Sequence, residues 1–349
     1  MNEIKNVLAV ETSCDDTSVA IVDHTGRVLT QVAAHQDLEH APYGGIVPEI
    51  ASRNHSVALL PLIELSLNKA GLTWPQIQGL AVTNRPGLIG SLIVGIMTLK
   101  SISQSYNIPL IGVNHLEGHL VAPFLSDDQY QPPVDFNYPY IALAVSGGHS
   151  SLYWVKAFGD YTVIGSTKDD AAGEAFDKFA KMVGLGYPGG VQVDRHSQLG
   201  LKNKYDFPRS LTSENNLMMS FSGLKSSAQR LIEKMSPEQK QAEQNDLCAS
   251  FQEAIVDVLV DKTLKAAKRF KCNKLVITGG VSANSRLRGR MSELSKNYQI
   301  VIPPMRYCTD NAAMIGYAGI MRLNNGERSG LNLGPSSQLM ETDFKYDLQ

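Results

Sequence analysis

The sequence predicts an α/β protein that contains two copies of one folding unit. Three short strands open each half, within residues 7–33 and 140–166. Each half then continues as strand, glycine-rich turn, helix, strand and helix, first at residues 79–123 and again from residue 274. Short runs of β-branched and apolar residues bounded by Gly, Asn or Asp are typical of strands. Because 349 residues are long for a single core, we expect two related lobes.

The first half gives the clearest series of elements. A polar turn rich in hydroxyls and acids, residues 11–17, follows the first strand and can hold a phosphate or a hydrated cation, or can be a plain turn. The expected elements are strands at 7–10, 19–22 and 28–33, a helix at 48–70, a strand at 79–83, a helix ending near 106, and a strand at 109–113. Residues 126–139 are polar and proline-rich, which is typical of a connection between domains.

The second half repeats this order. Its expected elements are strands at 140–145, 151–155, 161–166 and 274–278, a helix at 285–295, a strand at 299–302, and a helix that begins near Asp310. We therefore expect an N-terminal lobe of residues 1–135, completed by residues 324–349, and a C-terminal lobe of residues 136–323.

Composition excludes several classes of protein. The four cysteines are scattered without a CxxC pair, which indicates free thiols in a reducing, cytoplasmic location. A strand begins within a few residues of the start, so no signal peptide is expected, and no run approaches the about 18 apolar residues of a membrane span. The net charge of −2 gives no overall attraction to nucleic acid. Two basic clusters fit either a solvated helix face or a nucleic-acid contact: Lys265, Lys268, Arg269, Lys271 and Lys274, and Arg286, Arg288 and Arg290.

The pair His115 and His119 is the first candidate for chemistry. Residues four apart lie on one face of a helix, close enough to bind one metal ion. The strand at 109–113 would place them at the carboxyl edge of a sheet, where open α/β folds bind ligands. Core or solvent-facing histidines remain the alternative. A zinc protease is disfavoured, because Glu117 lies about 200° around the helix from His115 instead of directly following it.

Asp310 is the candidate third ligand. If the two halves are equivalent, Asp310 opens its helix where His115 opens the matching one, and the lobes would present both helix starts across one cleft. Two histidines and a carboxylate are a metal-ligand set that leaves positions open for substrate or water. In the simpler alternative, Thr309 or Asp310 only caps its helix.

Glycine turns and an acidic helix face suggest a nucleotide. Glycine pairs follow strands at 147–148 and 279–280, and a third lies at 189–190, where backbone N–H groups could approach a phosphate. No P-loop or dinucleotide motif is present. Asp170, Glu174 and Asp177 share a helical face that could hydrogen-bond a ribose or bind a metal, or could be an acidic first turn favoured by the helix dipole.

Several of these stretches resemble the motifs of one known family. They are ETSCDDT at 11–17, HLEGH at 115–119, VSGGH at 145–149, the acidic stretch at 169–178, SFSGLK at 220–225, GGVSAN at 279–284 and CTDN at 308–311. Over about residues 7–325 the chain resembles the bacterial tRNA N6-adenosine threonylcarbamoyltransferases, the TsaD family, once described as O-sialoglycoprotein endopeptidases. One departure is Arg85, where the family usually has glycine.

The resemblance implies a fold, a reaction and a set of site residues. The fold would be the duplicated actin/Hsp70-like (ASKHA) ATPase fold, with two lobes around a central cleft. The reaction would transfer threonylcarbamoyl from threonylcarbamoyl-adenylate to N6 of the adenosine 3′ of the anticodon in tRNAs reading ANN codons, releasing AMP. His115, His119 and Asp310 would bind one divalent metal ion per subunit, iron in the first place or else zinc. The implied substrate contacts are Ala144, Val145, Ser146, Gly147, Gly148, Asp177, Gly190, Asp194 and Asn284.

The resemblance also implies partners and leaves one role open. The partners would be tRNA, a smaller paralogue of the same fold (TsaB-like) and a small P-loop ATPase (TsaE-like), with no membrane. The general base is not identified, and Glu11 and Asp15 are the candidates. The alternatives are a kinase or ATPase of the same fold, whose activity would not need the histidines, a metalloprotease, and a catalytically silent scaffold subunit.

Overall fold

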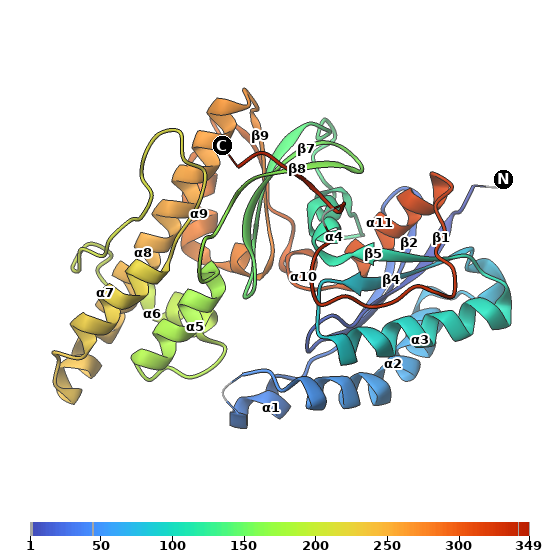
Figure 1. The fold of residues 1–349 in the computed structure, drawn as a ribbon, viewed down its shortest axis with the longest axis horizontal. Helices are drawn as coiled ribbons and strands as arrows, with labels where there is room; N and C mark the ends of the chain where they lie inside the picture. The colour runs from blue at the N-terminus through green and yellow to red at the C-terminus, as the bar shows by residue number, and fades with distance from the viewer. Residues whose placement is uncertain (1–2, 44, 341, 349) are drawn as a thin grey trace. The chain divides into compact units, whose positions relative to one another are not determined.

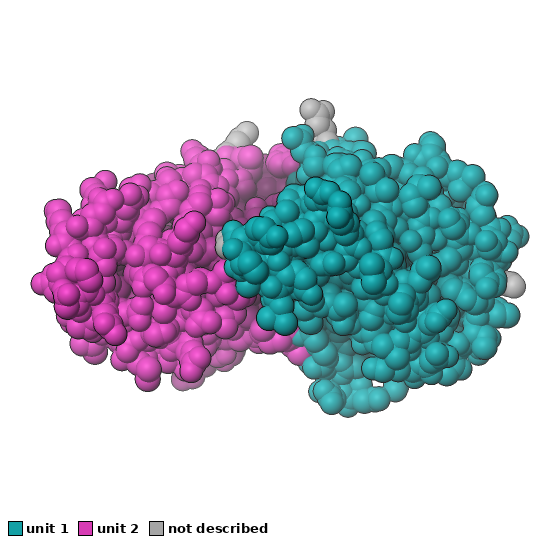
Figure 2. Space-filling model, turned by 90° about the horizontal axis from the view of Figure 1, so that it is seen from below, with its two compact units in different colours: residues 1–135, 306–343 teal, residues 136–305, 344–349 magenta. Residues whose placement is uncertain are grey.

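The computed structural model describes residues 3–43, 45–340 and 342–348, and its chain divides into two compact units. Unit 1 comprises residues 1–135 and 306–343, and unit 2 comprises residues 136–305 and 344–349 (Figure 2). The division differs from the expected lobes near the C-terminus. Residues 306–323 were expected in the C-terminal lobe but belong to unit 1, and residues 344–349 belong to unit 2.

Unit 1 is organised around a five-stranded sheet in the order β3-β2-β1-β4-β5. Its strands are β1 (Asn6–Glu11), β2 (Thr17–Asp23), β3 (Val28–Ala34), β4 (Gly79–Arg85) and β5 (Leu110–Asn114). β2 runs antiparallel to β1 and β3, with Val7 opposite Val22, whereas β1, β4 and β5 are parallel. The carboxyl ends of β1, β4 and β5 therefore lie along one edge of the sheet, the edge expected to carry the histidines.

Helices α2 (Pro48–Ala70) and α3 (Ile89–Tyr106) cover one face of this sheet, and α11 (Ala312–Asn324) covers the other. The shorter helices are α1 (Asp37–His40), α4 (His115–Val121) and α10 (Met305–Cys308), with the 3-10 helices η1 (Ala41–Tyr43), η2 (Trp74–Gln76) and η3 (Ala122–Phe124). α2 and α3 lie side by side on one face (Figure 1). Their buried Leu59, Ile63 and Ile96 pack with Leu8 and Val82 of the sheet in one apolar core.

Helix α11 packs on the opposite face of the same sheet, and small residues make this packing close. A side chain on Gly319 would begin 2.4 Å from the Cβ of Ala81, and one on Gly316 would begin 3.2 Å from that of Ala9. Glycine and alanine therefore let the helix approach the strands closely. This packing is the physical reason why residues 306–323 belong to unit 1 and not to the expected C-terminal lobe.

Unit 2 contains a second sheet in the order β10-β9-β6-β7-β8-β11. Its strands are β6 (Tyr140–Val145), β7 (Ser150–Ala157), β8 (Asp160–Ser166), β9 (Lys274–Thr278), β10 (Gln299–Val301) and β11 (Lys345–Tyr346). The order β8-β7-β6-β9-β10 repeats the order β3-β2-β1-β4-β5, with the same antiparallel and parallel pairings. The predicted duplication is thus confirmed, and β11 adds one strand beside β8.

The helices of unit 2 include several that the sequence pattern did not predict. They are α5 (Ala172–Met182), α6 (Gly189–Ser197), α7 (Ser222–Ile232), α8 (Pro237–Arg269) and α9 (Ser285–Glu293), with the 3-10 helix η4 (Gly280–Ala283). The long helix α8 forms the centre of this group, and its Phe251 stacks on Phe179 of α5 with 3.9 Å between ring centroids. Among the described residues, no helix is long and apolar enough to cross a membrane.

Candidate metal centre and substrate cavity

The two histidines lie on α4, directly after β5. Asn114 caps the helix by accepting a hydrogen bond from the backbone N–H of Leu116 at 2.8 Å, so α4 begins with His115. Both histidine side chains are buried, and their ring centroids lie 4.8 Å apart. The strand and the cap thus place two imidazoles on one face of a short helix at the carboxyl edge of the sheet, as predicted.

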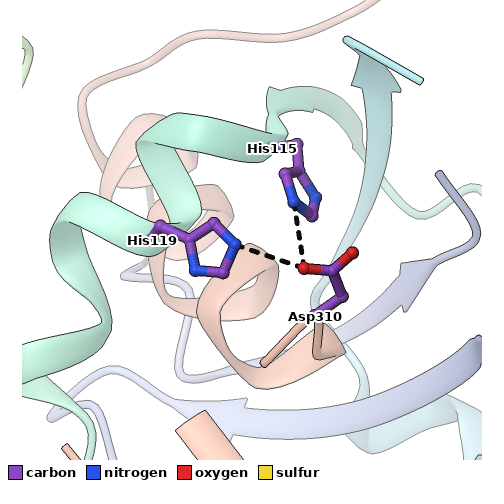
Figure 3. A group of neighbouring side chains, drawn as sticks. All are labelled: His115, His119 and Asp310. Atoms are coloured by element: carbon purple, nitrogen blue, oxygen red, sulfur yellow. Dashed lines mark hydrogen bonds and ion pairs between the residues drawn. The ribbon is translucent and has the colours of Figure 1, made fainter. Parts of the chain in front are cut away.

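Asp310 completes the group from the connection between α10 and α11. Its Oδ1 lies 3.3 Å from Nε2 of His115 and 3.3 Å from Nε2 of His119 (Figure 3). Asp310 is not the cap of α11, because the side chain of Asn311 accepts from the N–H of Met314. The expectation that two lobes present these residues across a cleft is wrong, since all three belong to unit 1.

The geometry of this group fits a divalent metal ion. One ligand atom from each residue lies within 4.8 Å of the others. The 3.3 Å separations match the about 3.4 Å between neighbouring ligands of a tetrahedral ion with bonds of about 2.1 Å. Burial lowers the pKa of His119 and so favours its neutral imidazole. The charges of Asp310 and Glu11, in contrast, outweigh burial and raise the pKa of His115, whose Nε2 would have to lose its proton to bind an ion. Three protein ligands leave further positions open for a substrate or water.

Glu11 contacts Nδ1 of His115, the ring nitrogen other than the one that faces Asp310. Glu11 ends β1, and its Oε2 lies 3.0 Å from Nδ1 of His115. The Thr83 hydroxyl and the Ser13 backbone N–H also donate to this carboxylate, which is 1% exposed. Burial would raise the pKa of Glu11, but the charge and hydrogen bond of His115 outweigh it and lower the pKa. An ionised Glu11 accepts a hydrogen bond from the Nδ1–H of His115, while Nε2 points at Asp310.

The two candidates for a general base therefore have different surroundings. Glu11 is already occupied by His115, Thr83 and Ser13, so its surroundings favour orienting the imidazole over exchanging protons with a substrate. Asp15 lies half-buried in the turn that follows β1.

Glu117 is unavailable for protease chemistry. Its buried carboxylate forms an ion pair with the guanidinium of Arg322, with 2.7 Å between Oε2 and Nε. Arg322 lies on α11, so this ion pair joins the histidine helix to the helix that follows Asp310. The protease alternative thus lacks the carboxylate that would act as base beside the metal.

Arg85, the departure from the family pattern, has a structural role. Its Nε donates to both carboxylate oxygens of Asp343, at 2.8 and 2.9 Å. The Asp343 side chain is 3% exposed. The ion pair between Arg85 and Asp343 thus connects the C-terminal part of unit 1 to the end of β4.

A separate cavity of about 410 Å³ lies in unit 2. Five of the nine predicted substrate contacts line it: Gly147, Asp177, Gly190, Asp194 and Asn284. Ala144, Val145, Ser146 and Gly148 do not, and the first two are buried within β6. The lining residues that were not predicted are Gly173, Phe176, Pro188, Val191, Gly280, Val281, Ala283 and Met305. Gly280 belongs to a glycine pair that is visible in the sequence. The apolar lining residues show no local sequence pattern that would identify them as part of a cavity.

The two carboxylates of the cavity also accept hydrogen bonds from the N-termini of helices. Asp177 accepts from the backbone N–H of Gly189 at 2.9 Å and of Gly190 at 3.3 Å, at the start of α6. Asp194 accepts from the N–H of Ser285 at 3.1 Å and from its hydroxyl at 2.7 Å, at the start of α9. These bonds fix the positions of both carboxylates in the cavity wall.

Asn284 is supported by a residue that the sequence did not single out. Its amide donates to Oε1 of Gln252 at 2.6 Å, and its own oxygen accepts from the N–H of Leu287. Gln252 lies on α8 and is 4% exposed.

Most members of the two basic clusters form internal contacts. Arg286 and Arg290 bind the carboxylates of Glu253 and Asp257, and Arg288 donates to the carbonyls of Ser282 and Pro303. Such contacts favour a structural role for the second cluster. In the first cluster, Lys265, Lys268 and Arg269 pair with Asp261, Glu214 and Asp347, and Lys274 donates to the side-chain oxygen of Asn137.

Comparison with known proteins agrees with the implied fold and family. A family model described as tRNA N6-adenosine threonylcarbamoyltransferase (TsaD) matches residues 27–317. The protein of that name from Bdellovibrio bacteriovorus is 63% identical over 344 residues, which are 98% of this chain and 100% of that protein. The one from Anaeromyxobacter dehalogenans is 47% identical over 338 residues, 95% of this chain and 99% of that protein.

Two solved structures share the fold at low sequence identity. T. kodakarensis HypF has a TM-score of 0.61 and 12% identity, covering 93% of this chain and 48% of HypF. Component A of (R)-2-hydroxyglutaryl-CoA dehydratase from Acidaminococcus fermentans has a TM-score of 0.51 and 14% identity, covering 91% of this chain and 99% of that protein. With the repeated strand order, these likenesses support the duplicated actin/Hsp70-like fold. The two close relatives and the family model show more than the fold: the chain belongs to the tRNA N6-adenosine threonylcarbamoyltransferase family.

Proposed function

We propose that this chain transfers the threonylcarbamoyl group from threonylcarbamoyl-adenylate to N6 of the adenosine 3′ of the anticodon in tRNAs that read ANN codons, releasing AMP. Family membership supports tRNA threonylcarbamoylation as the activity. The observation that carries the residue-level proposal is the convergence of His115, His119 and Asp310 on one point in unit 1.

His115, His119 and Asp310 are proposed to hold one divalent metal ion, iron in the first place or else zinc. Their nitrogen and carboxylate donors suit either ion. When bound, such an ion polarises a carbonyl or phosphoryl oxygen and supplies a fixed point for orienting the donor. Glu11 is proposed to fix the tautomer of His115, so that Nε2 carries its lone pair toward the ion.

The cavity of unit 2 is proposed to take the nucleotide part of the donor. Its volume of about 410 Å³ is within the range of small-molecule sites. Carboxylates such as Asp177 and Asp194 can accept hydrogen bonds from ribose hydroxyls, and Val191 and Val281 offer apolar surface to a base. The exposed glycine turn at Gly147 offers backbone N–H groups to a phosphate.

The transfer itself needs no protein nucleophile. The donor is a mixed anhydride, so the N6 nitrogen attacks the carbamoyl carbon directly while the bond from that carbon to the phosphate oxygen breaks. AMP leaves with the electron pair of that bond, and the attacking nitrogen loses a proton. Asp15 is the proposed acceptor of that proton, because Glu11 is occupied by His115. An exocyclic amine is a weak nucleophile, so positioning is expected to supply much of the rate.

The proposed partners are tRNA as substrate, a smaller paralogue of the same fold (TsaB-like) and a small P-loop ATPase (TsaE-like). All three come from the family and not from any contact in this chain.

A reconstituted reaction tests the function. The chain and its partners are incubated with tRNA that reads ANN codons, threonine, bicarbonate, ATP and the enzyme that makes the adenylate, and the nucleosides are analysed by mass spectrometry. We expect threonylcarbamoyladenosine from the wild type and from His24→Ala, an exposed histidine control. We expect none from His115→Ala. Absence of product with every component active would refute the transferase, and ATP hydrolysis that persists in His115→Ala without product would favour an ATPase.

A further inference from the structure

One carboxylate, that of Asp127, joins the two chain segments that carry the candidate metal ligands. Asp127 follows η3, the short helix into which the histidine helix α4 runs. Arg306 and Tyr307, which it contacts, precede Asp310 by only a few residues. All of these residues belong to unit 1.

Both oxygens of the Asp127 carboxylate accept several hydrogen bonds. Its Oδ2 accepts from Nε of Arg306 at 2.8 Å and from Nη2 at 2.7 Å, and also from the hydroxyl of Tyr307. Its Oδ1 accepts from Nη2 of Arg306 at 2.9 Å and from the backbone N–H groups of Gln129 and Tyr130 at 2.7 and 2.8 Å. A bidentate arginine pair fixes orientation as well as distance.

The cluster is largely buried, and its carboxylate is ionised. The Asp127 side chain is 17% exposed, and Tyr307 is 1% exposed. Burial would raise the pKa of Asp127, but hydrogen bonds from Tyr307 and Arg306 outweigh it and lower the pKa. Asp127 therefore stays ionised and bonded at neutral pH. The neighbouring Asp128 differs, because its side chain is 85% exposed and makes one ion pair with Arg27.

Asp310 is far along the chain from the two histidines. His115 and His119 lie on one helix and are fixed relative to each other, but Asp310 comes from a connection almost two hundred residues later in the chain. A metal site needs its ligands within about 0.5 Å of the productive geometry. A contact between the segment after α4 and the segment before Asp310 limits how far the carboxylate can move from the two imidazoles.

We propose that Asp127 is a positioning residue of the metal centre, which holds the Arg306–Tyr307 segment against the end of the histidine helix and thereby fixes Asp310 beside His115 and His119. The inference rests on the proposed metal centre. It assigns Asp127 no contact with the metal ion or the substrate.

Zinc affinity of the full-length metal-free protein tests this role. Each protein is titrated with zinc alone in competition with a chromophoric chelator. The proteins are the wild type, Asp127→Asn, Tyr307→Phe and the matched control Asp128→Asn. We expect Asp127→Asn to weaken zinc binding about 10- to 100-fold, the usual loss when a residue supporting a ligand is removed. Tyr307→Phe should weaken it less, and Asp128→Asn should bind as the wild type does.

The outcomes separate this inference from the proposal on which it rests. If the wild type binds zinc and His119→Ala does not, while Asp127→Asn and Tyr307→Phe both bind like the wild type, Asp127 has no positioning role. A lower melting temperature with unchanged affinity would assign it to general stability and would also overturn the inference. If the wild type itself fails to bind zinc or iron through the three ligands, the metal centre is refuted. If Asp127→Asn does not fold, the zinc affinity of Tyr307→Phe, which removes a single hydroxyl, tests the inference instead.

Discussion

Glu11 and His115 meet across the central strand of three parallel strands in unit 1. Glu11 ends β1 and His115 follows β5, and Oε2 of Glu11 lies 3.0 Å from Nδ1 of His115. Thr83 of the intervening strand β4 donates its hydroxyl to the same carboxylate. The carboxyl edge of one sheet thus supplies both a candidate metal ligand and the group that orients it.

Replacing Glu11 by Gln should weaken metal binding without removing a ligand. The amide keeps the shape of the side chain but loses the charge that holds the proton on Nδ1 of His115. We expect a loss of about 10- to 100-fold in affinity for zinc or iron, measured by competition with a chelator. Glu49→Gln, at an exposed ion pair with Arg53 on α2, is the control and should bind normally. Equal affinity in both variants would show that Glu11 does not support the site.

Removing the Asp194 carboxylate should weaken nucleotide binding in unit 2. Asp194 lines the cavity and is held there by Ser285. We expect Asp194→Ala to bind AMP about 10-fold more weakly in calorimetry, the effect of losing about 1.4 kcal/mol. Asp206→Ala removes a fully exposed carboxylate and should leave binding unchanged. A wild-type affinity in Asp194→Ala would place the nucleotide elsewhere.

Gly279 should not tolerate a side chain, although the adjacent Gly280 should. Gly279 has a φ of +88°, and a Cβ there would lie 2.3 Å from the carbonyl oxygen of Val145. We expect Gly279→Ala to lower the free energy of unfolding by about 1–3 kcal/mol in urea denaturation, because strain and close contact add. Gly280 has nothing within 4 Å of its Cβ position, so Gly280→Ala is the matched control. Equal stability of the two variants would contradict the turn geometry.

The Glu253 ion pairs should stabilise the fold at neutral pH and be lost in acid. Burial would raise the pKa of Glu253, but the hydrogen bonds and charge of Arg286 outweigh it and lower the pKa below its ordinary value of 4.5. The contribution is therefore complete above pH 4.5, where the unfolded chain is also ionised, and disappears as the pH falls through the lower folded value.

A comparison of Glu253→Gln with the wild type across pH tests this dependence. We expect the variant to be less stable by about 1–3 kcal/mol at pH 7, because it removes the nearer of the two carboxylates that pair with the Arg286 guanidinium, at 2.6 Å against 3.8 Å for Glu293. In urea denaturation the difference should shrink as the pH is lowered below 4.5. A difference that stays constant into strong acid would mean that the pKa of Glu253 is not lowered.

The sequence predicted the repeated series of strands and helices and the histidine pair because both are local patterns. Strand and turn signals fall within a few residues of each other, and the spacing of His115 and His119 alone sets their relation on a helix. The helix predicted at 48–70 coincides with α2.

The remaining features depend on contacts between distant residues. The small residues that bring α11 onto the first sheet, Ala81 and Gly319 among them, show no pattern until the two segments are packed together. For the same reason the expected lobes misplaced residues 306–323, and Asp310 was assigned to the C-terminal lobe although it belongs to unit 1. The pairing of Glu11 with His115, and the support of Asn284 by Gln252, likewise arise only in the folded chain.

Metal-dependent formation of the modified nucleoside is the most direct test. Metal-free wild type and His119→Ala are titrated with iron(II) in the reconstituted reaction, and threonylcarbamoyladenosine per tRNA is measured by mass spectrometry. We expect product from the wild type to rise with iron and level off at about one ion per chain, and product from His119→Ala to stay near background. Product that forms without metal, or that responds equally in both proteins, would contradict a metal centre built from His115, His119 and Asp310.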